Sequence, residues 1–199
     1  MQIYKAPLDD IRFILETFGY NEVAGLPGFE DYDLETAMAV LEESAKFCTK
    51  ELLPLNGVAD REGLKFNPET GDVTCPTGFK ALYDKFVAQG ATALTAPPEF
   101  GGFGAPHTLG VLQTEFATAT NKSFSMCPGL THGLIDALLN SGSDEQKAEY
   151  LPNLISGKWS GTMCLTEPHC GTDLGLCTTK AVPKENGAYS LDGTKIWIT

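Results

Sequence analysis

The sequence has few basic residues, and this shortage limits the partners it can have. Its 199 residues include 14 lysines and arginines against 26 aspartates and glutamates, which gives a formal net charge of −12. The first 60 residues hold 12 acidic and 4 basic side chains, so that segment alone contributes −8. A surface of this charge repels nucleic acid and anionic membranes. We therefore expect neither as a partner.

Signals for secretion and for membrane insertion are also missing. No positively charged segment followed by an apolar stretch opens the chain, which predicts a cytoplasmic protein without a secretory signal. The least polar long stretch, residues 124–142, contains His132, Asp136 and Asn140. This favours a buried helix over a membrane span.

The six cysteines include no C-x-x-C pair, and without a secretory signal we expect them to be reduced, small hydrophobic residues. Cys164, His169, Cys170 and Cys177 do cluster in the sequence. Their spacings are not those of a zinc finger or ribbon, and a fourth thiolate is lacking. We therefore expect no metal site.

Apolar residues recur every three or four positions through most of the chain, which is typical of amphipathic helices. Asp33 is a candidate N-cap, and Ser143 with Gln146 three residues later forms a capping-box pattern. Gly19, Pro54 and Gly157 are expected to end helices. The predicted helices cover residues 8–18, 33–53, 77–90, 107–119, 128–140 and 143–155.

Two segments between these helices are rich in glycine and proline. Residues 56–77 predict a long surface connection with a small hairpin around residues 69–72. Residues 97–106 precede a helix, as phosphate-binding loops do, but they lack the Gly-Lys-Ser/Thr ending. We interpret them as a tight turn between packed helices.

The periodicity changes at Trp159, where short runs rich in Thr, Val and Leu predict strands. Asp192-Gly193 is a type I′ hairpin signal. The fold class is therefore α+β, with an all-helical domain at 1–158 and the start of a β-rich domain at 159–199. Because these strands hardly complete a sheet, we expect the front portion of a longer protein. The predicted strands cover residues 159–166, 176–182, 188–191 and 194–199.

One stretch, residues 161–173, combines features of a nucleotide contact. Pro168 is expected to end a strand, and the small and polar residues after it predict a turn. A left-handed Gly171 would let the amides of Gly171 and Thr172 form an anion site. Thr166 and Thr199 would present hydroxyls at strand ends, and Trp197 a surface for a flat heteroaromatic ring. On pattern alone, ordinary roles as strand residues stay open for all of them.

The run Met-Cys-Leu-Thr-Glu-Pro-His-Cys-Gly-Thr-Asp at residues 163–173 resembles the flavin-contact segment of acyl-CoA dehydrogenases, and Lys-Ile-Trp-Ile-Thr at 195–199 resembles their second flavin-contact strand. Residues 4–13, 26–30 and 128–133 resemble the long subfamily that includes 3-methylmercaptopropionyl-CoA dehydrogenases. The resemblance covers essentially the whole chain. It implies an N-terminal helical bundle followed by the first strands of an antiparallel, barrel-like middle domain, with the family's C-terminal helical domain absent from this chain.

The resemblance also implies a cofactor, FAD, and residues that contact it. Met163 stands where many relatives have an aromatic residue, and Thr172 replaces a commoner serine. Thr172 also matches the CoA-binding surface, and His132 lies where the acyl chain approaches. From the residues alone, His132 at the start of an apolar helix equally fits a hydrogen-bonded core or cap residue. The implied FAD contacts are Met163, Leu165, Thr166, Gly171, Thr172, Trp197 and Thr199.

The implied reaction is α,β-dehydrogenation of an acyl-CoA thioester, with an electron-transfer flavoprotein as acceptor and a homo-oligomeric enzyme. The family's catalytic base lies in the C-terminal domain, so no catalytic residue is expected here. We expect surface or structural roles for Glu99, Glu115 and Glu167. Two alternatives stay open: a non-catalytic module completed by another subunit, and a related flavoenzyme with a different substrate, such as damaged DNA or a nitroalkane.

Overall fold

The computed structural model describes residues 3–198, and Thr199, one of the predicted flavin contacts, lies outside them. The chain divides into two compact units, Met1–Gly161 and Thr162–Thr199. The sequence places the domain boundary near residue 158, three residues earlier.

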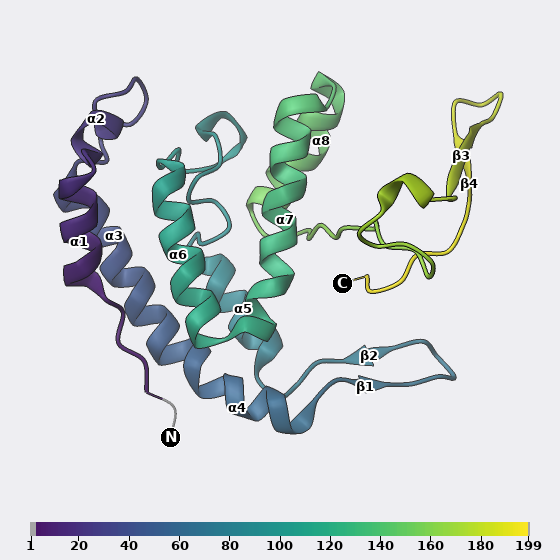
Figure 1. Cartoon of the computed structure of the whole chain (residues 1–199), viewed down its shortest axis with the longest axis horizontal. Coiled ribbons are helices and arrows are strands. Elements are labelled where there is room, and N and C mark those ends of the chain that lie inside the picture. Colours follow the sequence, from purple (N-terminus) through teal and green to yellow (C-terminus); the bar gives the residue numbers. More distant parts are fainter. Residues whose placement is uncertain (1–2, 199) are drawn as a thin grey trace. The chain divides into compact units, whose positions relative to one another are not determined.

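The first unit consists of helices and one small hairpin (Figure 1). Its helices are α1 (Leu8–Thr17), α2 (Tyr20–Ala24), α3 (Leu34–Phe47), the π-helical turn η1 (Cys48–Leu52), α4 (Leu53–Glu62), α5 (Phe79–Ala88), the 3₁₀ turn η2 (Pro98–Phe100), α6 (His107–Thr120), α7 (Lys122–Ser141) and α8 (Asp144–Ile155). Strands β1 (Lys65–Phe66) and β2 (Val73–Thr74) pair antiparallel and project from the helices (Figure 1).

The predicted caps at the starts of α3 and α8 are confirmed. The Asp33 carboxylate accepts from the Thr36 amide at 2.8 Å, which satisfies one of the unpaired N–H groups of the first turn. At α8, Ser143 Oγ accepts from the Gln146 amide and the Gln146 side chain accepts from the Ser143 amide, so the capping box is complete.

The prediction that the second helix ends at Pro54 is wrong. Proline cannot donate to the carbonyl four residues back, and here the preceding turn widens so that the Leu53 amide donates to the Cys48 carbonyl. The Asn121 side chain donates to the Leu52 carbonyl at 3.1 Å from the junction of α6 and α7. These contacts carry the chain past the proline, and Figure 1 shows α3, η1 and α4 as one continuous rod.

The loops were predicted less well than the longer helices. Residues 56–62 continue α4 instead of opening a loop, and α2 was not predicted. Gly78 caps α5 with φ of +88°, whereas Thr77, the predicted cap, uses its amide to bond the Glu62 carboxylate. The hairpin around residues 69–72 is confirmed.

Helix α7 begins at Lys122, six residues before the predicted start at Pro128. Asn121 caps it by accepting from the Phe124 amide at 3.1 Å. Pro128 and His132 therefore lie inside a helix rather than at its first turn.

Side chains from α1, α3, α5, α6 and α7 form the larger hydrophobic core, and α8 with parts of α7 and the 91–100 segment forms a smaller one. Leu41, Leu52, Leu109 and Phe116 are fully buried in the larger core. Phe124 contacts both Phe79 and Phe86 edge to face. Burial of these faces, rather than helix propensity, stabilises short helices in water.

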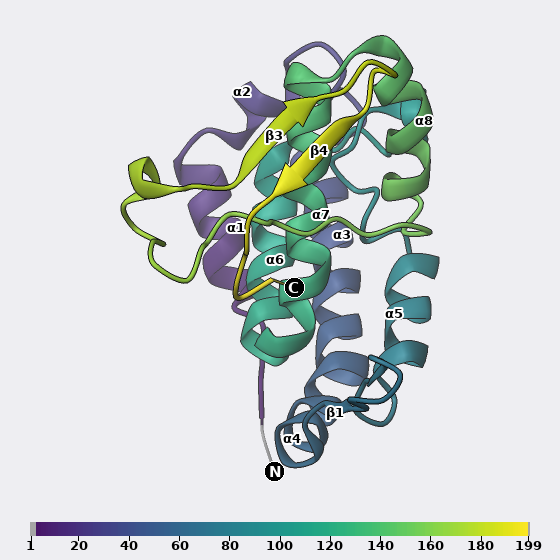
Figure 2. The same cartoon turned by 90° about the vertical axis from the view of Figure 1, so that its right-hand side faces the viewer.

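The second unit contains one antiparallel hairpin, β3 (Lys180–Pro183) with β4 (Tyr189–Asp192), and the 3₁₀ turn η3 (Leu174–Leu176) (Figure 2). Its turn is formed by residues 184–188, so the prediction of a hairpin turn at Asp192-Gly193 is wrong. The predicted strands at 159–166 and 194–199 are also not seen within the described residues. A strand needs a series of backbone hydrogen bonds to its neighbour to form a ladder, and neither segment forms one within the described residues.

None of the helices in residues 3–198 combines the length and the apolar character that crossing a bilayer requires.

Candidate functional site

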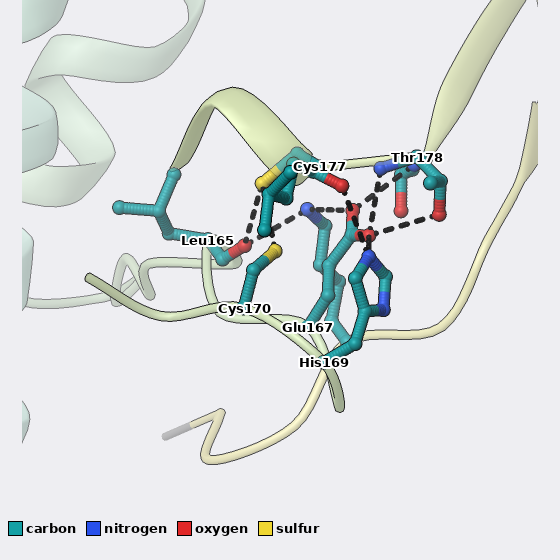
Figure 3. Close-up of polar contacts among 9 residues, drawn as sticks. Leu165, Glu167, His169, Cys170, Cys177 and Thr178 are labelled. Carbon is teal, nitrogen blue, oxygen red and sulfur yellow. Dashed lines mark hydrogen bonds and ion pairs between the residues drawn. The ribbon is translucent and has the colours of Figure 1, made fainter. Parts of the chain in front are cut away.

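The second unit is organised around Glu167, whose carboxylate is buried. Its Oε2 accepts from the Thr178 amide at 2.8 Å and the Thr178 hydroxyl at 3.1 Å. Its Oε1 accepts from the Thr179 amide at 3.0 Å and from Lys195 Nζ at 2.8 Å. Figure 3 shows dashed contacts, those from Thr178 among them, converging on the two carboxylate oxygens of Glu167.

The charge of this buried carboxylate is compensated locally. The ammonium of Lys195, followed by the amide of Thr178, holds the pKa of the Glu167 carboxyl far below its usual range, and the carboxylate in turn raises the pKa of Lys195. An ionised carboxylate with this set of donors is a structural anchor and not a proton acceptor. The predicted structural role of Glu167 agrees with this geometry.

The backbone reverses direction at Pro168-His169. The Glu167 amide donates to the Cys170 carbonyl at 2.9 Å, and the Cys170 amide donates back to the Glu167 carbonyl at 3.1 Å. Pro168, with its fixed φ and missing N–H, suits the corner of such a turn. The turn predicted after Pro168 is therefore present, although no strand precedes it.

The two segments that carry the predicted flavin contacts lie side by side. The Ile196 amide donates to the Thr166 carbonyl at 3.0 Å, and Lys195 Nζ donates to the Leu165 carbonyl at 2.9 Å. Together with the Lys195–Glu167 ion pair, these bonds join residues 165–167 to residues 195–196. Segments about thirty residues apart in sequence are thereby brought to one place.

The predicted contact side chains at this junction are open to solvent. Met163 is 56% exposed, Leu165 41% and Trp197 87%, and Thr166 is half-buried. Trp197 also has φ of +58°, a left-handed conformation that is uncommon and strained for a bulky residue. Large apolar side chains are therefore exposed in both segments of the junction.

Gly171 does not have the left-handed conformation that the sequence predicted. Glycine is favoured here for a different reason: a Cβ at this position would lie 3.3 Å from the Thr166 methyl carbon, so Thr166 would have to shift by a few tenths of an ångström. Gly171 and Thr172 are exposed, and within the described residues their amides donate to no other protein atom. Two adjacent amides of this kind can still bind an anion, so the anion site stays a prediction.

His132 lies in the middle of α7, within the first unit, so the field of a helix N-terminus does not act on it. Burial lowers the pKa of this histidine, His107 lowers it further, and Asp136 opposes the shift. His132 lines a pocket of about 30 Å³ together with Thr92, Thr95, Ala96, His107 and Asp136. The pocket is the size of a water molecule, and the predicted contact of His132 with an acyl chain stays a prediction.

Glu99 and Glu115, the other two carboxylates considered as possible bases, lie on the surface of the first unit. Glu99 is exposed in η2, and Glu115 is exposed on α6. Neither is buried beside a group that would tune it for proton transfer.

The sequence reasoning missed Lys195, Thr178 and Thr179 as partners of Glu167. Lys195 was recognised only as part of a strand motif, and no spacing rule connects it to a glutamate 28 residues earlier. The feature that calls for a cation is the burial of the Glu167 carboxylate, and the sequence does not show that burial.

The clustered cysteines and histidine are only partly brought together. Cys170 Sγ and Cys177 Sγ lie 3.6 Å apart, and His169 Nε2 lies 3.0 Å from the Leu176 carbonyl and 3.5 Å from Glu167 Oε2. The ligand atoms of Glu167, Cys170 and Cys177 lie within 4.8 Å of one another. Lys195 already neutralises the carboxylate of this group, so a metal ion would have to displace it. Cys164 Sγ contacts the Thr162 hydroxyl instead.

The fold agrees with what comparison with known proteins shows. Residues 35–158 match the family model of the acyl-CoA dehydrogenase N-terminal domain. The chain therefore belongs to the acyl-CoA dehydrogenase family, and the predicted resemblance is confirmed.

Among individual relatives, 3-methylmercaptopropionyl-CoA dehydrogenase from Ruegeria pomeroyi is 45% identical over 197 residues, which are 98% of this chain and 33% of that protein. Butyryl-CoA dehydrogenase from Megasphaera elsdenii superposes with a TM-score of 0.68 at 25% identity, over 81% of this chain and 40% of that one. An acyl-CoA dehydrogenase from Bacillus anthracis, solved in complex with FAD, superposes with a TM-score of 0.68 at 26% identity. The match covers 85% of this chain and 27% of that one. The chain thus spans about a third of the length of the curated relative.

Proposed function

We propose that this chain supplies the N-terminal helical domain and the first part of the flavin-binding middle domain of a cytoplasmic, FAD-dependent acyl-CoA dehydrogenase. The observation that carries the proposal is the hydrogen bond from the Ile196 amide to the Thr166 carbonyl. It places the two segments that match the family's flavin contacts next to each other. The proposed domains are residues 1–158 and 159–199.

The residues at this junction fit a bound flavin. Met163, Leu165 and Thr166 offer an apolar surface with a hydroxyl for the isoalloxazine ring, and Trp197 offers a flat face on the other side of the junction. Gly171 leaves room beside Thr166 that a Cβ would fill, and the free amides of Gly171 and Thr172 suit a pyrophosphate. Thr199 is assigned to the flavin on family resemblance alone.

FAD, when bound, would supply the hydride acceptor for oxidation of the acyl-CoA at its α and β carbons. The residues of this chain would bind and orient it and exclude water from one of its faces. Thr172 is assigned to the CoA side of the turn, and His132 to the approach of the acyl chain. The proton acceptor, the electron-transfer flavoprotein that reoxidises the cofactor, and a homo-oligomeric assembly belong to the proposal for the whole enzyme.

The test uses the protein extended at its C-terminus to the length of the curated relatives. We expect it to be purified with flavin absorbance and to reduce an artificial electron acceptor when an acyl-CoA is added. An extended protein that binds no FAD and oxidises no acyl-CoA would contradict the proposal. Failure of the 199-residue chain alone to bind FAD would not, because much of the cofactor surface lies outside it.

Substitutions at the junction test which residues hold the cofactor. Trp197→Ala and Thr166→Val in the extended protein should each weaken FAD affinity by about fivefold, because a stacked ring or one hydrogen bond contributes about 1 kcal/mol. Trp159→Phe is the matched control, since Trp159 lies in the first unit beside Tyr150. Equal FAD affinity in all three variants, measured by equilibrium dialysis, would show that the flavin does not bind at this junction.

A further inference from the structure

Cys170 and Cys177 face each other inside the second unit, and nothing in the proposed dehydrogenase chemistry uses them. Their sulfurs are 3.6 Å apart, and both belong to the group drawn in Figure 3. A disulfide requires the sulfurs to approach to about 2.05 Å, so a change in the side-chain torsions must bring them together. The other four cysteines take no part in this pair.

The Glu167 network fixes the backbone at both ends of the pair. Cys170 exchanges two backbone hydrogen bonds with Glu167. Thr178, next to Cys177, donates its amide and its hydroxyl to the Glu167 carboxylate. One buried side chain therefore positions both cysteines, and the two thiols are held close without being joined.

The two sulfurs differ in access and share a nearby cation. Cys170 is buried, whereas Cys177 is partly exposed and can meet a small oxidant from solvent. The ammonium of Lys195 lies close enough that a thiolate on either cysteine would raise the pKa of that lysine. Burial, the Cys177 thiol and the Glu167 carboxylate raise the pKa of the Cys170 thiol. Cys177 is therefore the sulfur that reacts first.

We propose that Cys170 and Cys177 form a reversible dithiol site that reacts with hydrogen peroxide to give an intramolecular disulfide. The Cys177 thiolate attacks one peroxide oxygen, so that an S–O bond forms, the O–O bond breaks and hydroxide leaves and becomes water. The Cys170 sulfur, after losing its proton to solvent, attacks the sulfenic sulfur, so that the S–S bond forms and a second water leaves. Two thiols are oxidised, and one peroxide is reduced to two waters.

The disulfide would close a short loop that contains Gly171, Thr172 and η3 (Leu174–Leu176). This is the turn assigned above to the FAD pyrophosphate and to CoA. Any effect of oxidation on cofactor binding rests on that proposed function, whereas formation of the disulfide does not. The primary experiment therefore measures only the covalent bond and the mobility of the loop.

The test uses the purified protein with Cys164→Ser as background, because Cys164, Cys170 and Cys177 share one tryptic segment between Lys158 and Lys180. After reduction and desalting, the protein is treated with hydrogen peroxide and blocked with a thiol reagent in denaturant. Intact mass should show the loss of two hydrogens, reversed by dithiothreitol. Cleavage on the N-terminal side of Asp173 should leave the two halves joined until they are reduced. Amides 171–176 should exchange hydrogen more slowly in the oxidised protein.

Two matched variants, Cys170→Ser and Cys177→Ser, should each abolish this cross-link, while far-UV circular dichroism confirms that they remain folded. The proposal is overturned if the loss of two hydrogens persists in Cys177→Ser, or if cleavage before Asp173 separates the halves of the oxidised protein without reduction. It is also overturned if the protein as purified holds one zinc ion and both thiols resist alkylation until a chelator is added.

Discussion

At the scale of single residues, Glu167 has a structural role inside the segment 163–173 that resembles the family's flavin-contact motif. Four donors from Thr178, Thr179 and Lys195 meet its buried carboxylate. A buried charge is stable only when it is paired and hydrogen-bonded, and removing one partner leaves the other unpaired. The position of the segment at residues 195–196, and with it Trp197, therefore depends on this carboxylate.

The depressed pKa of Glu167 predicts the direction of acid sensitivity. A carboxyl whose folded-state pKa lies below its unfolded value of about 4.3 contributes stability that is fully present above that pH and is lost as the pH falls through the folded-state pKa. Glu167→Gln should lower the thermal midpoint of the second unit by several degrees at neutral pH and should flatten the decline of that midpoint in acid. Hydrogen exchange of residues 162–198, followed as a function of temperature between neutral pH and acid, measures both effects.

Glu115→Gln is the control for this prediction, because Glu115 is exposed on α6. It should keep the parent's thermal midpoint and acid profile. An acid profile unchanged in Glu167→Gln would show that the carboxylate does not stabilise the second unit through its charge.

At the scale of elements, the ends of the helices were largely readable from the sequence where a side chain makes the cap. Ser143→Ala should destabilise the protein by about 1 kcal/mol, because the first turn of α8 loses the acceptor for its Gln146 amide. Ser160→Ala, at an exposed position outside any helix, should change the free energy of unfolding by less than about 0.5 kcal/mol. Urea unfolding of both variants tests the difference, and equal stabilities would show that the capping box contributes nothing.

Glycines inside two neighbouring helices should respond to alanine in opposite directions. Within the described residues, a Cβ at Gly129 or Gly133 of α7 would meet no atom within 4 Å, so each Gly→Ala change should stabilise by about 0.5–1 kcal/mol through backbone entropy. A Cβ at Gly110 of α6 would lie 2.7 Å from the Thr95 methyl carbon, so Gly110→Ala should destabilise.

The free energy of unfolding from urea titrations compares these three variants directly. A loss of stability in both Gly129→Ala and Gly133→Ala would mean that the exposed face of α7 packs against a further part of the protein. A neutral Gly110→Ala would mean that Thr95 moves aside freely.

The sequence does not predict a helix end when that end depends on hydrogen bonds to residues from another part of the fold. Pro54 fails to end its helix because a π turn precedes it and Asn121 bonds the Leu52 carbonyl from another helix. The predicted strands at 159–166 and 194–199 fail for a different reason, since the one backbone hydrogen bond between them in the described residues, from the Ile196 amide to the Thr166 carbonyl, does not make a ladder. A local pattern can suggest an extended segment, but a ladder requires a neighbour.

At the scale of the whole molecule, the core lies in the first unit. Both hydrophobic clusters use residues between Ala6 and Ile155, and Cys170 is the one buried hydrophobic residue of the described part of the second unit. We therefore predict that a chain ending at Gly161 folds alone, with the same urea midpoint as residues 1–199.

Leu41→Ala tests this independence. It should cost about 2–5 kcal/mol in both the full and the shortened chain, because Leu41 is fully buried in the first unit and substitutions act additively when the rest of the structure is independent of them. A shortened chain that unfolds non-cooperatively, or a cost that differs between the two chains by more than about 1 kcal/mol, would contradict the prediction.

The sequence by itself determined the family, the helical character of residues 8–155, and the caps at Asp33 and Ser143. Each depends on a local pattern: a motif, a periodicity of three to four residues, or a side chain that bonds a backbone amide three positions away. The predicted turn after Pro168 has the same local origin, because proline fixes its own φ.

Only the tertiary structure decided the rest. In the folded chain Lys195 pairs with Glu167, and the Ile196 amide bonds the Thr166 carbonyl. Gly171 lies close to the Thr166 methyl carbon, and the Cys170 and Cys177 thiols lie next to each other. The residues that these contacts join are too far apart in the sequence for any local periodicity to set their distance in space. Their geometry follows from the path of the folded backbone, because buried charges and unpaired amides must find partners wherever that path brings them.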